Sequence, residues 1–178
     1  MENMVRVTLL LFALGFLAAC ASLDEAECRS GDWYSVGYED GTKGRFLSFF
    51  DRHVKACAKH GITPQKSPWI EGREDGLRRY CTPENAYRVG RSGRWMNSVC
   101  TAQEAAAFAE ANKVGRTYYK ITQEIRELEA EKRDIEGILA TLTDPDDPYY
   151  IDLVRERRKI RREIRWLELD RLDFDSWP

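Results

Sequence analysis

The clearest hydrophobic pattern lies in the C-terminal third of the chain. Between residues 116 and 172 the sequence is rich in Glu, Arg and Lys, and two series of positions advance alternately by four and three. The series are Ile121, Ile125, Leu128, Lys132, Ile135, Leu139 and Leu142, then Leu153, Arg157, Ile160, Ile164, Leu167 and Arg171. Such heptad spacing is typical of coiled-coil helices. A short Pro- and Asp-rich break separates the series, so we predict an antiparallel coiled-coil hairpin over residues 116–172 and a tail over 173–178.

Signals for helix boundaries recur upstream, between residues 33 and 115. Ser67-Pro68 and Thr82-Pro83 each place a hydroxyl before a proline, and Thr101 with Glu104 forms a capping-box pattern. The apolar positions from Phe46 to Cys57 have helical spacing, and Gly61 follows them as a C-terminal cap. These signals predict several short helices and an all-α fold.

This region also contains a glycine-containing repeat. Gly37-Tyr38-Glu39-Asp40-Gly41 resembles Gly72-Arg73-Glu74-Asp75-Gly76, and Gly90-Arg91-Ser92-Gly93 is a shorter echo. Asp-Gly is a strong hairpin-turn signal, but Trp33, Gly37, Gly41 and Gly44 would also share one face of a helix. We favour helices, because the flanks do not alternate apolar and polar residues as strands do. Glycines on one face would let helix backbones approach closely, and the structural repeat positions are Gly37, Asp40, Gly41, Gly72, Asp75, Gly76, Gly90 and Gly93.

The N-terminal segment is typical of an export signal. An apolar run from Val7 to Leu17 follows Arg6, and the run closes as Leu17-Ala18-Ala19-Cys20, which looks like a lipobox. The run is too short for a membrane-spanning helix, which needs about 20 apolar residues. We therefore expect residues 1–19 to be a lipoprotein signal peptide and residues 20–32 a tether lipidated at Cys20. The alternative is an ordinary secretory signal. Ala21 after the cysteine favours an anchor in the outer membrane, with the protein facing the periplasm.

The remaining cysteines are Cys28, Cys57, Cys81 and Cys100. An even number of cysteines in an exported protein indicates disulfides, although several pairings are open. We favour Cys28 with Cys57 and Cys81 with Cys100, because each bond would then close one local unit.

A resemblance to a known family extends over Asp32 to Gly115. It rests on Asp32, Trp33, Gly37, Asp40, Gly41, Cys57, Gly72, Arg73, Gly76, Leu77, Tyr80, Cys81, Thr82, Pro83, Asn85, Gly90, Gly93 and Cys100. Together these resemble a bacterial envelope lipoprotein family of unknown function, domain of unknown function number 2799. The chain departs from that pattern at Ala86 and Trp95. The resemblance implies an envelope location and a framework of disulfide and glycines, and it supplies no catalytic residue.

Other candidate chemistry is weaker. His53, Cys57 and His60 share a helical face that suits zinc, but Cys57 is needed for a disulfide. Ser30, Ser35 or Ser48 with a histidine and an acid would nominally form a hydrolase triad, yet no Gly-x-Ser-x-Gly motif is present.

The repeated acids Asp40 and Asp75 suggest either a glycosidase carboxylate pair or structural hydrogen bonds, and we favour the latter. We expect no catalytic residue, no metal and no cofactor.

Charge gives limited guidance to the partner, because the net charge is only −2. The basic stretch at residues 155–165 predicts salt bridges to the facing helix or contact with anionic headgroups; export argues against nucleic acid. We favour salt bridges to Glu124, Glu127, Glu131 and Asp134.

The function that we predict is non-enzymatic binding or scaffolding of another envelope protein through residues 116–172, and self-association stays open. The alternative is a module for cell-wall glycan or a small ligand, with stacking by Trp33, Trp69, Tyr80, Tyr87 and Trp95. A hydrolase comes third.

Overall fold

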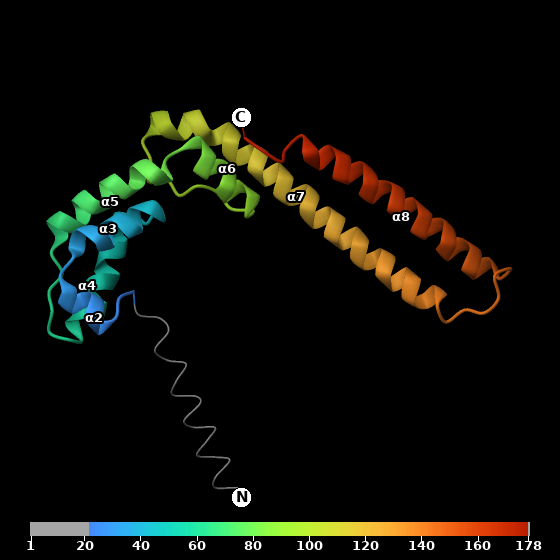
Figure 1. Ribbon diagram of the computed structural model, residues 1–178, viewed down its shortest axis with the longest axis horizontal. Helices are drawn as coiled ribbons and strands as arrows, with labels where there is room; N and C mark the ends of the chain where they lie inside the picture. The colour runs from blue at the N-terminus through green and yellow to red at the C-terminus, as the bar shows by residue number, and fades with distance from the viewer. Residues whose placement is uncertain (1–21, 178) are drawn as a thin grey trace, which may run out of the picture. The chain divides into compact units, whose positions relative to one another are not determined.

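The computed structural model describes residues 22–177 and is entirely helical in that range, as the sequence predicted. It has seven α-helices, one short 3-10 helix and no strand there (Figure 1). The elements are α2 (Glu25–Ser30), α3 (Trp33–Thr42), η2 (Leu47–Phe49), α4 (Phe50–Ala58), α5 (Lys66–Tyr80), α6 (Pro83–Arg91), α7 (Ala102–Leu139) and α8 (Pro148–Leu172). The expected signal peptide and Cys20 lie outside the described residues. No helix in the described range is long and apolar enough to span a membrane.

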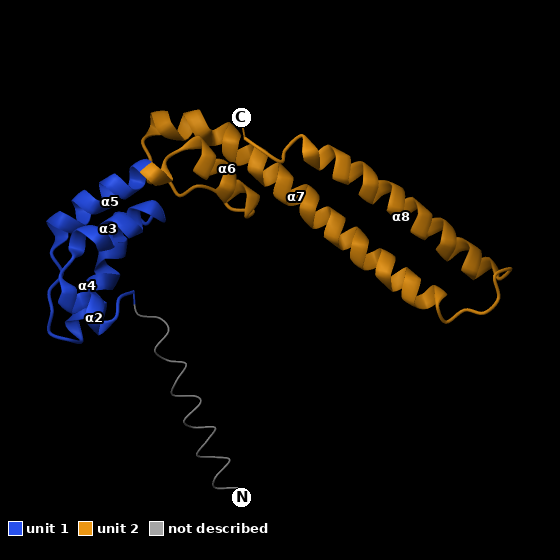
Figure 2. Cartoon of the chain, viewed as in Figure 1, with its two compact units in different colours: residues 1–78 blue, residues 79–178 orange. Residues whose placement is uncertain are grey.

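The chain divides into two compact units, residues 1–78 and 79–178 (Figure 2). The boundary predicted at 115/116 falls inside α7, which is continuous through that point. The segment predicted as a tether, residues 20–32, contains α2, which belongs to the first unit. A capping box of Asp24 and Glu27 begins α2, and Leu23 and Cys28 are buried in the core.

The core of the first unit gathers residues from α2, α3, α4 and α5. Its buried members are Leu23, Cys28, Trp33, Phe50, Cys57 and Trp69. A disulfide joins Cys28 of α2 to Cys57 of α4, which is the pairing favoured from the sequence.

Helices α3 and α5 cross with their backbones in contact at four glycines. A methyl group added to Gly37 would overlap the carbonyl oxygen of Trp69, and one added to Gly72 would overlap that of Tyr34. Likewise, a methyl group on Gly41 would overlap the carbonyl oxygen of Arg73, and one on Gly76 would overlap that of Tyr38. Each glycine therefore faces the residue three positions before its partner glycine, so only hydrogen fits at these four positions.

Gly44 does not share this face, contrary to the sequence prediction. It lies beyond α3 with φ at +64°, and the Arg45 N–H donates to the Asp40 carbonyl oxygen across it. This is a left-handed helix cap, for which glycine is preferred. Ser67 likewise lies inside α5 instead of at its N-cap, since α5 begins at Lys66.

The second unit repeats the glycine contact where α6 crosses α7. A methyl group on Gly90 would overlap the carbonyl oxygen of Asn112, and one on Gly115 would overlap that of Tyr87. Ala86, Tyr87, Phe108 and Ala111 are buried around this crossing. Thr82 caps α6, and Thr101 with Glu104 forms the predicted capping box of α7.

A disulfide joins Cys81 to Cys100 in the same unit, again as favoured from the sequence. Further along, α7 and α8 run side by side in opposite directions (Figure 1). Their shared buried residues are Ile121, Ile125, Ile135, Ile160, Ile164 and Leu167, all of which belong to the two heptad series.

We expect Gly37→Ala to destabilise the chain by about 2–3 kcal/mol, since α3 and α5 must separate to admit the methyl group. The matched control is Gly137→Ala, because this glycine of α7 has no atom within 4 Å of an added Cβ. Alanine there should stabilise the helix by about 0.5–1 kcal/mol. Urea unfolding of residues 22–178 measures both free-energy changes. Equal effects of the two substitutions would contradict the close backbone contact between α3 and α5.

Candidate functional site

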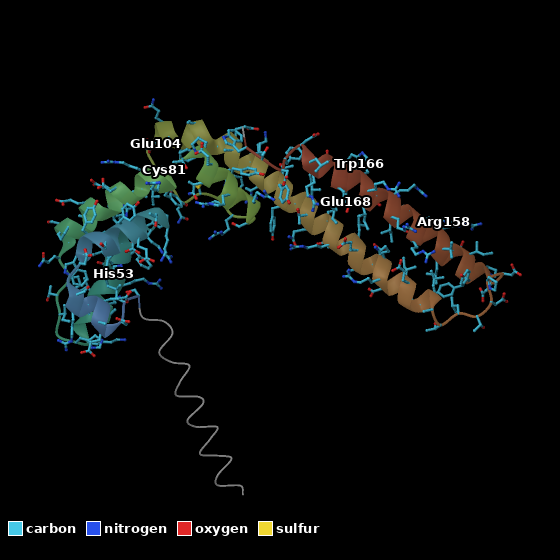
Figure 3. The ribbon with its side chains drawn as sticks, viewed as in Figure 1. His53, Cys81, Glu104, Arg158, Trp166 and Glu168 are labelled. Carbon is cyan, nitrogen blue, oxygen red and sulfur yellow. A yellow bond between two sulfur atoms is a disulfide. The ribbon has the colours of Figure 1, made fainter. Side chains whose placement is uncertain are left out.

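Asp40, at the end of the first repeat, is the centre of a buried polar network. Its Oδ2 accepts a hydrogen bond from Trp69 Nε1 at 2.9 Å and lies 2.6 Å from His53 Nε2. The other ring nitrogen of His53, Nδ1, lies 3.1 Å from Ser22 Oγ. The Asp40 carboxylate thus joins α3 to α4 and α5, and His53 extends the network to Ser22 in the segment before α2. Figure 3 shows His53 inside the first unit.

The connectivity Ser22–His53–Asp40 has the order of a nucleophile, a base and an acid. A cavity of about 470 Å³ is lined by these three residues together with charged side chains of both signs, which include Glu27, Glu39, Lys43, Arg45 and Arg52. The serines considered from the sequence, Ser30, Ser35 and Ser48, are not part of it; Ser30 Oγ, for example, donates to the carbonyl oxygen of Glu27. Sequence reasoning missed Ser22 because no local motif precedes it. The His53 side chain is only 2% exposed, so the network first satisfies polar groups within the core.

Asp75, the counterpart of Asp40 in the second repeat, has different partners. Its Oδ2 accepts from the Tyr34 hydroxyl at 2.6 Å, and this bond raises the pKa of the Tyr34 phenol. Its Oδ1 lies 3.0 Å from Arg78. Asp40 and Asp75 thus occupy separate hydrogen-bonding positions, each with its own partners within the fold.

A buried cation accompanies Asp40. Arg73 donates from Nε to the Arg45 carbonyl oxygen at 2.8 Å. Burial lowers the pKa of the Arg73 guanidinium, while the negative charges of Asp40 and Glu74 act in the opposite direction. The core of the first unit therefore contains a carboxylate whose charge Arg73 offsets.

The candidate zinc ligands do not converge on one point. Cys57 is in the disulfide with Cys28, His53 bonds Asp40, and His60 Nδ1 lies 3.4 Å from Glu25. Within residues 22–177, no cluster of three or more His, Cys, Asp or Glu side chains is placed to hold a metal.

Four of the five candidate stacking aromatics are buried. These are Trp33, Trp69, Tyr80 and Tyr87. Trp95 alone of that set is exposed, at 67%, and the Arg116 guanidinium lies 3.7 Å from its ring centroid. A cavity of about 420 Å³ lies beside Trp95 in the second unit.

The third candidate surface is the outer face of α8. We define it by Arg158, Arg161, Arg162, Arg165, Trp166, Leu169 and Leu172. Trp166, Leu169 and Leu172 are 62–65% exposed, and Figure 3 labels Arg158 and Trp166 along this helix. Within the described residues, the ion pairs of α8 are internal to the helix and join Arg155 to Asp152 and Lys159 to Glu156. The four arginines of the face have no carboxylate partner in the described part of the chain.

The salt bridges predicted from this basic stretch to Glu124, Glu127, Glu131 and Asp134 are therefore not formed in the described residues. The reason is helical geometry. Ile160, Ile164 and Leu167 bury one side of α8 against α7. At 3.6 residues per turn, Arg158, Arg162 and Arg165 fall on the opposite side, about a helix diameter from α7.

Asp40→Ala should destabilise the first unit by about 3 kcal/mol, because it leaves the Trp69 and His53 N–H groups buried without an acceptor. Its matched control is Glu39→Ala on the same helix, which removes only an exposed pair with Lys43. Thermal unfolding monitored by circular dichroism distinguishes the two. If neither substitution lowered the melting temperature, the network would not be what stabilises the core.

Comparison with known proteins identifies one part of the chain. Residues 32–117 match the family model described as "Protein of unknown function (DUF2799)". No curated protein and no solved structure matches the chain. The matched segment contains both glycine crossings and three of the four disulfide cysteines, whereas α8 lies outside it. Over residues 32–117 the chain is thus similar to the DUF2799 family of proteins of unknown function.

Proposed function

We propose that this chain is a non-enzymatic envelope lipoprotein that binds an acidic surface of another envelope protein through the outer face of α8. The observation that carries the proposal is the set of four arginines on that face, which lack carboxylate partners in the described residues and adjoin three exposed apolar side chains.

The residue types on this face suit a protein interface. Arginine and tryptophan are the residues most enriched among those that contribute most to protein–protein binding. Residues 155–165 include seven basic and two acidic side chains, so an acidic partner would be attracted over a distance and held in register. Trp166 and Leu169 would supply the apolar contact that charge pairs alone do not provide.

The helix pair would act as a rigid arm. We propose that α7 and α8 form a coiled-coil hairpin, in keeping with the heptad positions in their shared core. Its seam is imperfect, because Arg157 occupies a heptad position and its Nε is buried without a hydrogen-bond partner. Charged seam residues weaken a self-sufficient pair, which favours a partner that completes the bundle.

The location that we propose rests on the N-terminal sequence. We propose that residues 1–19 are removed and that Cys20 is acylated, which would hold the protein at the outer membrane on its periplasmic side. Two disulfides are compatible with this oxidising compartment.

Cys20→Ser should abolish acylation and release the protein into the soluble periplasmic fraction, since the acyl chains supply the membrane affinity. Palmitate labelling followed by membrane fractionation measures both effects. Ala21→Ser, which leaves the cysteine in place, is the control. A Cys20→Ser protein that still labels and still sediments with membranes would refute the lipid anchor.

Substituting Arg158, Arg162 and Arg165 with Glu should weaken partner binding by at least about tenfold, because attraction to an acidic surface becomes repulsion. The matched control changes the same amount of charge on α7, with Lys120, Arg126 and Arg133 replaced by Glu. Crosslinking and affinity capture of the full lipoprotein from its own envelope identifies the partner, and titration of the purified pair gives the affinity.

A second pair of variants tests the apolar part of the face. Trp166→Ala should reduce capture, whereas Tyr149→Ala, an exposed aromatic at the opposite end of α8, should not. Retained capture by the triple Glu variant would contradict the proposal. The proposal would also be overturned if capture recovered anionic lipid or lipopolysaccharide instead of a protein. Loss of that lipid in the triple Glu variant would show that the outer face of α8 binds headgroups.

A further inference from the structure

We infer that the first unit docks on the anionic phospholipid headgroups of the membrane that carries its lipid anchor. The contact is made by what we call the anchor-side surface, which consists of Arg45, Phe46, Leu47 and Arg52. The two arginines line the cavity of about 470 Å³, and the two apolar side chains are exposed. The inference rests on the proposed acylation of Cys20, and it does not involve the outer face of α8.

The chain itself brings this surface close to the anchor. Ser22 lines the same cavity, and its Oγ lies 3.1 Å from Nδ1 of the buried His53. Cys20 is two residues before Ser22, and two residues of chain reach about 7 Å at most. The headgroup layer on each side of a bilayer is about 5–7 Å thick. An acylated Cys20 would therefore hold the wall of the cavity at the depth of the lipid headgroups.

The two arginines carry charges that the fold does not neutralise. The guanidinium carbons of Arg45 and Arg52 lie 4.5 Å and 5.3 Å from the centroid of the Phe49 ring. Both side chains are exposed, and neither has a carboxylate partner among residues 22–177. Guanidinium groups bind phosphate oxygens through paired, charge-assisted hydrogen bonds. These two side chains are therefore suited to the phosphates of a lipid surface.

The acidic residues in the cavity lining already have partners. Glu39 pairs with Lys43, and Glu27 accepts a hydrogen bond from the Asp24 N–H at 2.7 Å. Asp40 is held in the buried network by two donors. The charges left for a ligand at this cavity are therefore those of the two arginines, which are complementary to an anionic membrane.

The apolar part of the surface is a turn between two residues that line the cavity, Arg45 and Phe49. In this turn, Phe46 and Leu47 are 48% and 55% exposed. The Phe49 N–H donates to the Phe46 carbonyl oxygen at 2.9 Å, and Arg73 Nε donates to the Arg45 carbonyl oxygen at 2.8 Å. Apolar side chains next to arginines suit the boundary between headgroups and acyl chains, where each kind finds its own environment.

This contact would orient the protein and would not anchor it. Membrane attachment becomes stable when two signals act together, and either one alone is weak and reversible. The acyl chains on Cys20 would supply the attachment, and the anchor-side surface would set how the first unit sits on the membrane. A chain without acyl groups is then released when membranes are washed, but it still binds vesicles at high lipid concentration.

The first experiment measures vesicle binding by the mature chain without acyl groups, which is residues 20–178 with Cys20→Ser and both disulfides formed. Vesicles of phosphatidylcholine alone are compared with vesicles of phosphatidylcholine and phosphatidylglycerol in equal parts, by sedimentation over a range of lipid concentrations. We expect at least about tenfold tighter binding to the anionic vesicles, because each arginine near such a surface contributes about fivefold. Equal binding to both kinds of vesicle, or no binding to either, would overturn the inference.

Charge variants locate the binding. Arg45→Gln combined with Arg52→Gln should weaken binding to the anionic vesicles by at least about tenfold. The matched control is Lys59→Gln combined with Lys66→Gln, which removes the same charge from exposed positions outside the cavity lining. Since distant charges are screened by salt, the control should weaken binding by less than about threefold. Equal losses in the two double variants would show that binding follows net charge alone, and would overturn the inference.

Apolar variants separate a membrane from other ligands. Phe46→Ser combined with Leu47→Ser should weaken vesicle binding by at least about tenfold. Ile138→Ser combined with Tyr149→Ser, at two exposed positions of the second unit, should leave it unchanged. If inorganic phosphate at constant ionic strength abolished binding and the Phe46 and Leu47 changes had no effect, the cavity would bind a free anion and not a membrane. Binding lost only in the triple Glu variant of α8 would place the lipid on α8. Either result would overturn the inference.

The result does not depend on the anchor, because the chain used for vesicle binding carries no acyl group. Palmitate labelling of Cys20 together with no vesicle binding would overturn the anchor-side surface and uphold the anchor. Vesicle binding that is lost in the Arg45 and Arg52 variant, together with no labelling of Cys20, would support the surface and refute the anchor.

Discussion

The close contact of helix backbones at paired glycines is the constraint on which the rest of the structure depends. At both crossings, α3 with α5 and α6 with α7, each glycine lies against the carbonyl oxygen of the residue three positions before its partner glycine. Helices with larger side chains at the contact pack with their axes about 8–10 Å apart. Each glycine costs up to about 1 kcal/mol of helix propensity, so the crossings must be stabilised by the contacts that the close approach makes possible.

The buried network of the first unit follows from the same geometry. Asp40 directly precedes Gly41 in α3, and Trp69 of α5 provides both the carbonyl that faces Gly37 and the indole N–H that binds Asp40. A carboxylate buried at a crossing needs several donors to offset its lost hydration. His53, Trp69 and the nearby charge of Arg73 meet that need, so the acid in the repeat is explained by packing.

Local and periodic features were predictable from the sequence, and long-range ones were not. The capping residues Thr82 and Thr101 and the apolar positions shared by α7 and α8 depend on residues near one another or on a fixed period. The cysteine pairing was predictable for another reason, because four cysteines allow few pairings. The Ser22–His53 contact joins residues 31 positions apart without a motif. Gly115 was also missed, because its partner Gly90 is in another helix and no repeated string surrounds it. The predicted salt bridges of α8 failed because charge composition does not say which side of a helix faces its neighbour.

The continuity of α7 links the second glycine crossing to the proposed binding face. Within this one helix, Gly115 contacts α6 and Ile121 begins the core shared with α8. The Gly90–Gly115 contact leaves no room for α7 to approach α6 further, so this crossing fixes the position of α7 against α6. Since α8 packs along the same α7, its outer face is presented on a helix pair with a fixed support, which suits the rigid arm that we propose.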